Sequence, residues 1–243
     1  MTTPPPLTDD SALFLDVDGT LLDIAPTPQA VSVSPQLIEI LEQLQTRLHG
    51  AVALVSGRSI ATLDALFAPL KLPASGLHGL ECRLPSGAVR TIGGDPAALA
   101  AARDAAAAFV QTTPSVVLED KGLALAIHYR QAPQQERAVK ELAQRLVNRF
   151  AHGLQIQEGK MVVELRPHGA DKGTTIDTFM TEPPFTGRVP VFVGDDATDE
   201  HGFEAVNRLR GVSVHVGAVA RTAARYSLPT VNAVHRWLEA AVP

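Results

Sequence analysis

The chain has 243 residues, of which 45% are hydrophobic and 19% charged, a balance typical of a folded globular protein. Its formal net charge of −5 argues against a surface that coats nucleic acid, and its single cysteine, Cys82, excludes an intramolecular disulfide. The first residues lack the pattern of a secretory signal, and no stretch reaches the about 18 apolar residues that cross a bilayer. We therefore expect a cytoplasmic protein without a nucleic-acid or membrane partner.

The first predicted elements alternate between strand and helix. Residues 12–16 are apolar up to Asp16 and predict a fully buried strand. Ser34 and Pro35 provide an N-cap and a first-turn proline for a helix whose leucines recur at helical spacing. Residues 51–55 predict a second buried strand, and another amphipathic helix follows it. This order indicates a right-handed crossover between parallel strands.

The C-terminal part repeats this alternation, whereas the middle of the chain differs. Residues 189–193 and 212–216 predict buried strands with a helix between them. The middle carries two predicted helices, over residues 96–110 and 133–150, and four strands that we expect to be antiparallel where short turns join them. These strands are predicted at residues 115–121, 123–130, 154–157 and 161–166.

Together these elements predict an α/β protein with a doubly wound, Rossmann-like parallel core and an inserted α+β cap domain. We expect the core to comprise residues 1–92 and 167–243, and the cap to comprise residues 93–166. One continuous domain with an irregular sheet is the alternative that the pattern leaves open.

The sharpest chemical signal is Asp16-Val-Asp18-Gly19-Thr20, at the carboxyl end of the first predicted strand, where open α/β sheets bind ligands. Two carboxylates at the end of a buried strand need a metal ion, another cation or a shared proton. Gly19 allows a sharp turn that brings backbone N–H groups close to an anion. The same residues also suit an ordinary turn, so this motif alone leaves both interpretations open.

Three further polar segments end or follow predicted core elements. Ser56, with Gly57 beside it, suits a phosphate oxygen or a simple helix cap. Lys172 stands at a predicted helix start, which a lysine avoids unless it faces negative charge, although a solvated surface lysine is the alternative. A cluster of acids, suited to a hard divalent cation or to the start of the next helix, comprises Asp195, Asp196, Asp199 and Glu200.

In this order the four segments resemble the core motifs of the haloacid dehalogenase (HAD)-type superfamily of phosphotransferases, and the insert lies where that superfamily places its second type of cap. The resemblance implies that Asp16 is the nucleophile and Asp18 the general acid and base. It further implies that Ser56 and Lys172 hold the phosphoryl group. The metal implied is Mg²⁺, which suits oxygen ligands. The implied metal-site residues are Asp16, the backbone carbonyl of Asp18, and Asp195, with Asp196 and Asp199 supporting the site directly or through water.

Within that superfamily the chain resembles the trehalose-6-phosphate phosphatase family. The matching pieces are Leu54-Val-Ser56-Gly57-Arg58, Gly76-Leu-His78-Gly79-Leu-Glu81, Glu119-Asp-Lys121-Gly122, His128-Tyr-Arg130, Gly159-Lys160, Glu164-Leu-Arg166-Pro167 and Gly194-Asp-Asp-Ala-Thr-Asp-Glu200. The implied substrate is a small sugar phosphate, and the implied reaction is hydrolysis of trehalose 6-phosphate.

Alternation along the predicted cap strands separates a polar face from an apolar one. A mixed polar face of this kind suits sugar hydroxyls, although a solvated sheet face has the same composition. The candidate substrate-binding residues are Gly57, Arg58, Glu119, Lys121, His128, Arg130, Lys160 and Glu164. For Arg58 the alternatives are orientation of Ser56 and a surface ion pair.

Other functions remain open on sequence grounds. A phosphatase of another sugar phosphate, such as sucrose phosphate, shares the same core residues. A phosphoryl-receiving signalling domain also combines acids and a lysine on an α/β sheet, but Asp18 supplies a base for hydrolysis. A sugar-binding module without activity is a third alternative. The first strand lacks the Gly-x-Gly-x-x-Gly pattern of a dinucleotide-binding oxidoreductase.

Overall fold

The computed structural model describes residues 2–24, 31–150, 153–159, 161–218 and 221–242. The chain forms two compact units, the first from Met1–Arg90 and Asp171–Pro243 and the second from Thr91–Ala170. The cap expected at 93–166 lies within the second unit. Each unit has its own hydrophobic core.

The first unit is built on a sheet that, within the described ranges, has eight strands in the order β12-β11-β10-β1-β2-β3-β4-β5. Neighbouring strands from β12 to β3 pair in parallel, and β4 pairs antiparallel with β3. The strand bounds are β1 Ser11–Leu15, β2 Val52–Val55, β3 Ala74–Gly76, β4 Glu81–Arg83, β5 Val89–Thr91, β10 Val189–Gly194, β11 Val212–Val216 and β12 Tyr226–Leu228.

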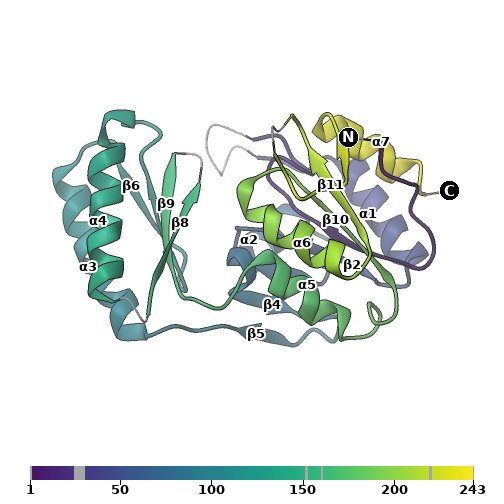
Figure 1. Ribbon diagram of the computed structural model, residues 1–243, viewed down its shortest axis with the longest axis horizontal. Helices are drawn as coiled ribbons and strands as arrows, with labels where there is room; N and C mark the ends of the chain where they lie inside the picture. Colours follow the sequence, from purple (N-terminus) through teal and green to yellow (C-terminus); the bar gives the residue numbers. More distant parts are fainter. Residues whose placement is uncertain (1, 25–30, 151–152, 160, 219–220, 243) are drawn as a thin grey trace. The chain divides into compact units, whose positions relative to one another are not determined.

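Helices cover this sheet, with α5 and α6 packed against each other and α1 packed against α7 (Figure 1). Ser34 accepts the N–H of Leu37 at 3.2 Å and caps α1, as the sequence predicts. Between the layers, Phe14 of β1 lies 5.2 Å from Phe185 between ring centroids. The helix bounds are α1 Pro35–Arg47, α2 Ile60–Leu66, α5 Lys172–Met180, α6 Glu200–Arg208 and α7 Val231–Glu239, with 3₁₀ turns η2 Leu77–Gly79 and η4 Ala197–Asp199.

The sheet order places a topological switch point at β1. From β1 the chain continues through α1 to β2 on one side, whereas β10 pairs with the other side of β1. Open α/β sheets bind ligands at such a point, outside the carboxyl ends of the strands. The segments that follow β1, β2 and β10 therefore meet at one edge of the sheet.

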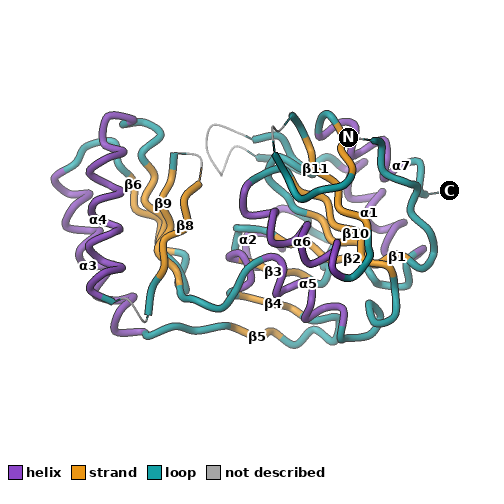
Figure 2. Tube along the Cα trace, viewed as in Figure 1, coloured by secondary structure: helices purple, strands orange, loops and turns teal. Residues whose placement is uncertain are grey.

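The second unit is a four-stranded antiparallel sheet in the order β6-β7-β9-β8, with α3 and α4 packed on one face (Figures 1 and 2). Apolar residues of β7 and β9, including Leu125, Ile127, Val163 and Leu165, join the helices in one core. The bounds are α3 Pro96–Thr112, β6 Val117–Asp120, β7 Leu125–His128, η3 Pro133–Gln135, α4 Glu136–Arg149, β8 Gln155–Gly159 and β9 Val162–Arg166. Of the described helices in either unit, none combines the length and the apolar character that a bilayer span requires.

The sequence prediction missed the short elements β3, β4, β5, β12 and α7, and it extended two cap strands too far. Ser115, expected in a strand, has a left-handed φ of 68°, and β6 begins only at Val117. The strand predicted over 123–130 ends at His128, and Arg130 lies in a turn. Three-residue strands such as β3 are too short to show an alternating pattern.

Candidate active site

The centre of the site is the ammonium group of Lys172, which lies between two carboxylates from distant parts of the chain. Lys172 Nζ donates to Asp16 Oδ1 at 2.8 Å and to Asp199 Oδ1 at 2.5 Å. The three side chains are at most 6% exposed. Asp171 caps α5 through the N–H of Thr174, at 2.7 Å, and so fixes Lys172 as the first residue of the helix. The buried carboxylates explain why a lysine occupies a helix N-terminus.

The loop after β10 is held together by Asp199. Its Oδ2 accepts the backbone N–H groups of Asp195 and Asp196, both at 2.9 Å. Asp195 in turn lies against the turn after β1, where Thr20 Oγ1 donates to its Oδ1 at 3.3 Å. Gly19 has a φ of 89°, and a Cβ there would stand 2.1 Å from Asp195 Oδ2. The turn therefore needs glycine both for its backbone conformation and for the space beside Asp195.

The electrostatics of this cluster favour an added cation. Burial, together with the nearby charges of Asp199 and Asp196, raises the pKa of Asp195 to about 7 against the opposing effect of Lys172. Burial also raises the pKa of Asp16, although Lys172 opposes the shift. One ammonium group thus faces several carboxylates in a place with little solvent. A divalent cation would keep these carboxylates ionised.

The donor set also fits a metal ion. Asp16, Asp195 and Asp199 each offer a carboxylate oxygen, and these oxygens lie within 4.8 Å of one another. Oxygen-only ligands suit Mg²⁺ or a similar hard cation. Because Asp199 already accepts from Lys172 and from two backbone N–H groups, Asp16 and Asp195 are the better-placed ligands. This acidic group is therefore a candidate metal site.

Asp196 caps the turn that follows β10. Its Oδ1 accepts the N–H of Thr198 at 2.8 Å and the hydroxyl of Thr198 at 2.7 Å, so it caps the 3₁₀ turn η4. Within the part of the chain that the structure describes, the metal-binding group does not include Asp196. Support of the metal site by Asp196, directly or through water, stays a prediction.

Asp18, in the turn after β1, forms an ion pair with Arg58, in the turn after β2. Arg58 donates from Nε to Asp18 Oδ2 and from Nη2 to Asp18 Oδ1, both at 2.6 Å. Ser56 is buried, and its Oγ accepts the backbone N–H of Arg58 at 3.1 Å. The Arg58 side chain therefore contacts Asp18, whereas its backbone orients Ser56. An exposed surface pair, one alternative for Arg58, does not fit a side chain that is 12% exposed.

In the second unit, the sheet face opposite the helices is polar. The register places Glu119, Ala126, Glu164 and Gln157 in one row across the four strands. Lys121 Nζ donates to Glu164 Oε1 at 2.5 Å, and the His128 ring nitrogen Nε2 lies 2.8 Å from Glu119 Oε2.

Four of the predicted cap residues are thus brought together as two pairs. Lys160 lies outside the described residues, and Arg130 is exposed beyond the end of β7.

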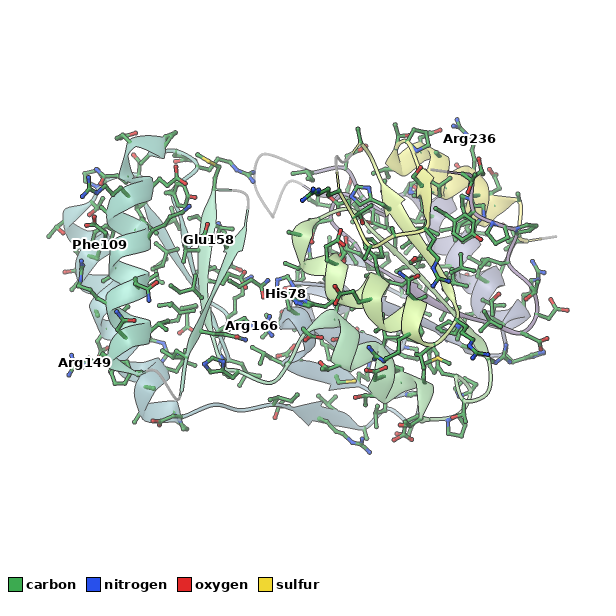
Figure 3. All side chains as sticks on the ribbon, in the orientation of Figure 1. His78, Phe109, Arg149, Glu158, Arg166 and Arg236 are labelled. Atoms are coloured by element: carbon green, nitrogen blue, oxygen red, sulfur yellow. The ribbon has the colours of Figure 1, made fainter. Side chains whose placement is uncertain are left out.

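Two further polar residues of this face, Arg166 and Gln157, are not among the predicted binding residues. Arg166, labelled in Figure 3, is 2% exposed and donates to the side chain of Gln157 and, at 2.6 Å, to the carbonyl of Ala170. Both residues lie on the polar face by the same alternation that selected Glu164, so the period-two pattern could have found them.

Comparisons with known proteins find a matching family and several relatives. The trehalose-phosphatase family model matches residues 14–232. Trehalose-6-phosphate phosphatase of Escherichia coli is 45% identical over 242 residues, covering 98% of this chain and 89% of that protein.

Two solved structures share the fold. The C-terminal domain of C. albicans trehalose-6-phosphate phosphatase aligns with a TM-score of 0.83 at 21% identity, over 99% of this chain and 98% of that one. A HAD-superfamily phosphatase of Bacteroides thetaiotaomicron aligns with a TM-score of 0.62 at 19% identity, over 93% and 91% of the two chains. The expected HAD-type fold and the family resemblance are confirmed, and the chain belongs to the trehalose-phosphatase family.

Proposed function

We propose that this protein is a Mg²⁺-dependent phosphatase that hydrolyses trehalose 6-phosphate to trehalose and phosphate. The observation that carries the proposal is the buried contact of Lys172 with Asp16, 2.8 Å apart, beside Asp195 at the switch point of the sheet. Family membership supports the substrate, because the E. coli relative is named for that activity.

Asp16 acts as the nucleophile in the first half of the reaction. Its carboxylate oxygen attacks phosphorus, and the bond from phosphorus to the sugar oxygen breaks. Lys172 keeps Asp16 ionised and, with Ser56, holds the phosphoryl oxygens. Asp18 donates a proton to the departing sugar oxygen, which leaves as the hydroxyl of trehalose.

The second half of the reaction releases phosphate. Asp18, now a carboxylate, accepts a proton from water as the water oxygen attacks the aspartyl phosphate on Asp16. The bond from phosphorus to Asp16 breaks, which restores both aspartates and frees inorganic phosphate. Arg58 holds both carboxylate oxygens of Asp18 in the structure, so one of these two hydrogen bonds must open before Asp18 can carry the proton that it donates.

Asp16 and Asp195, with the backbone carbonyl of Asp18, are the residues that would hold Mg²⁺. The ion, when bound, supplies positive charge that offsets the charge of the phosphoryl oxygens. The role of Asp199 is to fix Lys172 and the loop that carries Asp195.

The polar sheet face of the second unit supplies the sugar specificity. The carboxylates of Glu119 and Glu164 accept hydroxyl hydrogens, and Lys121 and His128 donate to hydroxyl oxygens. Their pairing in the structure keeps these side chains in defined positions. A disaccharide offers more hydroxyls to such a face than a monosaccharide, so we expect trehalose 6-phosphate to be preferred over glucose 6-phosphate.

Phosphate release from a panel of sugar phosphates, with and without Mg²⁺, tests the proposal. We expect the highest kcat/KM with trehalose 6-phosphate, and loss of activity with a chelator. Asp16→Asn should fold but lose hydrolysis, whereas Asp23→Asn, which changes an exposed aspartate in the same segment, should keep it. Equal efficiency with sucrose phosphate or glucose 6-phosphate would remove the substrate assignment, and turnover by Asp16→Asn would remove the nucleophile.

A further inference from the structure

The segment Gly76–Glu81, between β3 and β4, takes no part in the steps proposed above, yet it is fastened to the phosphate-binding turn after β2. Leu77 donates its N–H to the carbonyl of Arg58 at 2.9 Å, and His78 donates its N–H to the carbonyl of Ser56 at 3.0 Å. Glu81 Oε2 accepts the N–H of Ile60, the first residue of α2, at 2.8 Å. The segment therefore fixes the backbone on both sides of Gly57.

The backbone of this segment is unusual. Leu77 and His78 have consecutive left-handed φ values of 51° and 53°, followed by Gly79 at 101°. Left-handed conformations are disfavoured for residues with a side chain and are rare for leucine. Such outliers gather at functional sites, where surrounding contacts hold them in place. Here the hydrogen bonds to Ser56 and Arg58 hold the left-handed backbone in place, and His78 is the polar residue in this stretch.

The imidazole of His78 occupies the space where residue 57 would carry a side chain. A Cβ on Gly57 would stand 2.4 Å from His78 Nε2 and 2.7 Å from Cε1. Gly57 is absent from the residues with positive φ, so its backbone does not itself demand glycine. The ring of His78 therefore explains the glycine, and its Nε2 lies against the backbone that follows Ser56.

His78 is labelled in Figure 3, and its ring lies against the turn that carries Ser56. This turn borders the proposed phosphoryl site.

We propose that His78 binds the phosphoryl group of the substrate through Nε2–H, as a third side-chain donor beside Ser56 and Lys172. This inference rests on the proposed function only in placing a phosphoryl group at Asp16. An imidazole in contact with Gly57 supplies a directional hydrogen bond where the backbone N–H groups of the turn meet the anion. The competing explanation is that His78 only fills space above Gly57.

Binding of inorganic phosphate in the presence of Mg²⁺ tests the proposal without involving the sugar. In His78→Asn, the asparagine tolerates a left-handed backbone, so the segment keeps its conformation while the imidazole is lost. We expect the phosphate dissociation constant from calorimetry, and its inhibition constant against p-nitrophenyl phosphate, to rise about 10- to 100-fold. Unchanged phosphate binding would overturn the proposal.

His49→Asn is the matched control. His49 has a left-handed φ of 52°, like His78, but it is exposed. It precedes β2, whereas Ser56 follows the other end of that strand. We expect His49→Asn to bind phosphate as the wild type does. An equal loss in both variants would show a general effect of the substitution and would overturn the proposal.

Gly57→Ala provides a second, independent variant, because the added methyl group displaces the His78 ring without removing it. We expect Gly57→Ala to weaken phosphate binding in the wild-type background and to add little in the His78→Asn background. Fully additive losses would overturn the proposal. If the wild type binds phosphate and cleaves p-nitrophenyl phosphate but not trehalose 6-phosphate, the substrate assignment fails while the role of His78 stands.

Discussion

The ammonium group of Lys172 lies 2.5 Å from the carboxylate of Asp199, and both side chains are buried. The two residues begin helix α5 and end the 3₁₀ turn η4, so this contact joins the two segments that support the proposed phosphoryl site. Asp199 also accepts two backbone N–H groups of the acidic loop. The position of Lys172 and the position of Asp195 are therefore coupled through one carboxylate.

This coupling predicts that Lys172→Met is more destabilising than Asp199→Asn. Loss of Lys172 leaves Asp16 and Asp199 buried without their counter-charge, and breaking a buried pair in this way costs about 3–5 kcal/mol. Asp199→Asn leaves Lys172 paired with Asp16 and removes one of several crowded negative charges. Urea unfolding at pH 8 with a chelator measures the free energy of unfolding of both variants. A larger loss in Asp199→Asn would contradict this account of the cluster.

Stability should also depend on pH and Mg²⁺ together. The pKa of Asp195 is raised from 3.8 to about 7, so between these values the folded protein retains a proton that the unfolded chain releases. Without metal, stability therefore falls as pH rises through this window, by up to about 1.4 kcal/mol per pH unit for one group. A bound cation favours the ionised carboxylates, so its stabilising effect grows with pH.

Thermal unfolding at pH 5 and pH 8, with Mg²⁺ or with a chelator, checks this linkage. We expect Mg²⁺ to raise the Tm more at pH 8 than at pH 5. In Asp195→Asn the difference between the two pH values should shrink, because the shifted carboxyl group is gone. An equal Mg²⁺ effect at both pH values in the wild type would count against a metal bound by these carboxylates.

Gly19→Ala should reduce hydrolysis because it displaces Asp195, and this effect is separate from the loss of stability that the substitution also causes. An added Cβ would overlap Asp195 Oδ2, 2.1 Å away, and move the carboxylate proposed to bind the metal. Gly87→Ala is the matched control, since Gly87 also has a left-handed φ, 84°, but has no atom within 4 Å of the added Cβ. Each variant pays a similar backbone strain of roughly 1–2 kcal/mol.

Only Gly19→Ala should show reduced hydrolysis and a higher Mg²⁺ concentration for half-maximal activity. Unfolding free energies and Mg²⁺ titrations of activity separate the two effects. If Gly87→Ala were equally inactive, the loss would come from backbone strain and not from displacement of Asp195.

Much of the parallel core and the order of its motifs could be predicted from the sequence. Buried strands ending at Asp16 and before Asp195 show as continuous apolar runs, and parallel strands bring their carboxyl ends to one edge. What the sequence does not contain is which oxygen meets which donor. Asp196 and Asp199 are the same residue type, and the sequence does not distinguish their roles. In the structure, Asp196 accepts the N–H of Thr198 at the start of η4, whereas Asp199 is buried against Lys172.

Contacts between distant segments were harder still to predict. The pairing of Arg58 with Asp18 joins residues 40 positions apart, and no local pattern selects it over a contact between Arg58 and Ser56. The contact of His78 with Gly57 depends on the left-handed backbone of Leu77 and His78. The sequence Gly76-Leu-His78-Gly79 does not predict that conformation. Such contacts arise from tertiary packing that local propensity does not encode.

The two faces of the cap sheet allow a last, matched pair of substitutions. Glu164 lies on the polar face, is 8% exposed and accepts from Lys121, whereas Glu158 of β8 lies on the opposite face and pairs with Lys140 of α4 at 2.9 Å. Figure 3 labels Glu158. Glu164→Gln replaces a proposed acceptor of sugar hydroxyls by an uncharged amide. Hydrogen bonds to a charged group contribute about 1.5–3 kcal/mol, so the KM for trehalose 6-phosphate should rise at least about tenfold.

Hydrolysis of p-nitrophenyl phosphate, which has no sugar, should be unchanged in Glu164→Gln, and Glu158→Gln should leave both substrates unaffected. Steady-state kinetics on the two substrates distinguish a sugar-binding face from a merely structural ion pair. A structural role for Glu164 would alter both substrates alike, because the sheet itself would be disturbed. A selective rise in KM for the sugar phosphate requires that the carboxylate of Glu164 contact the sugar, and an unchanged KM would show that it does not.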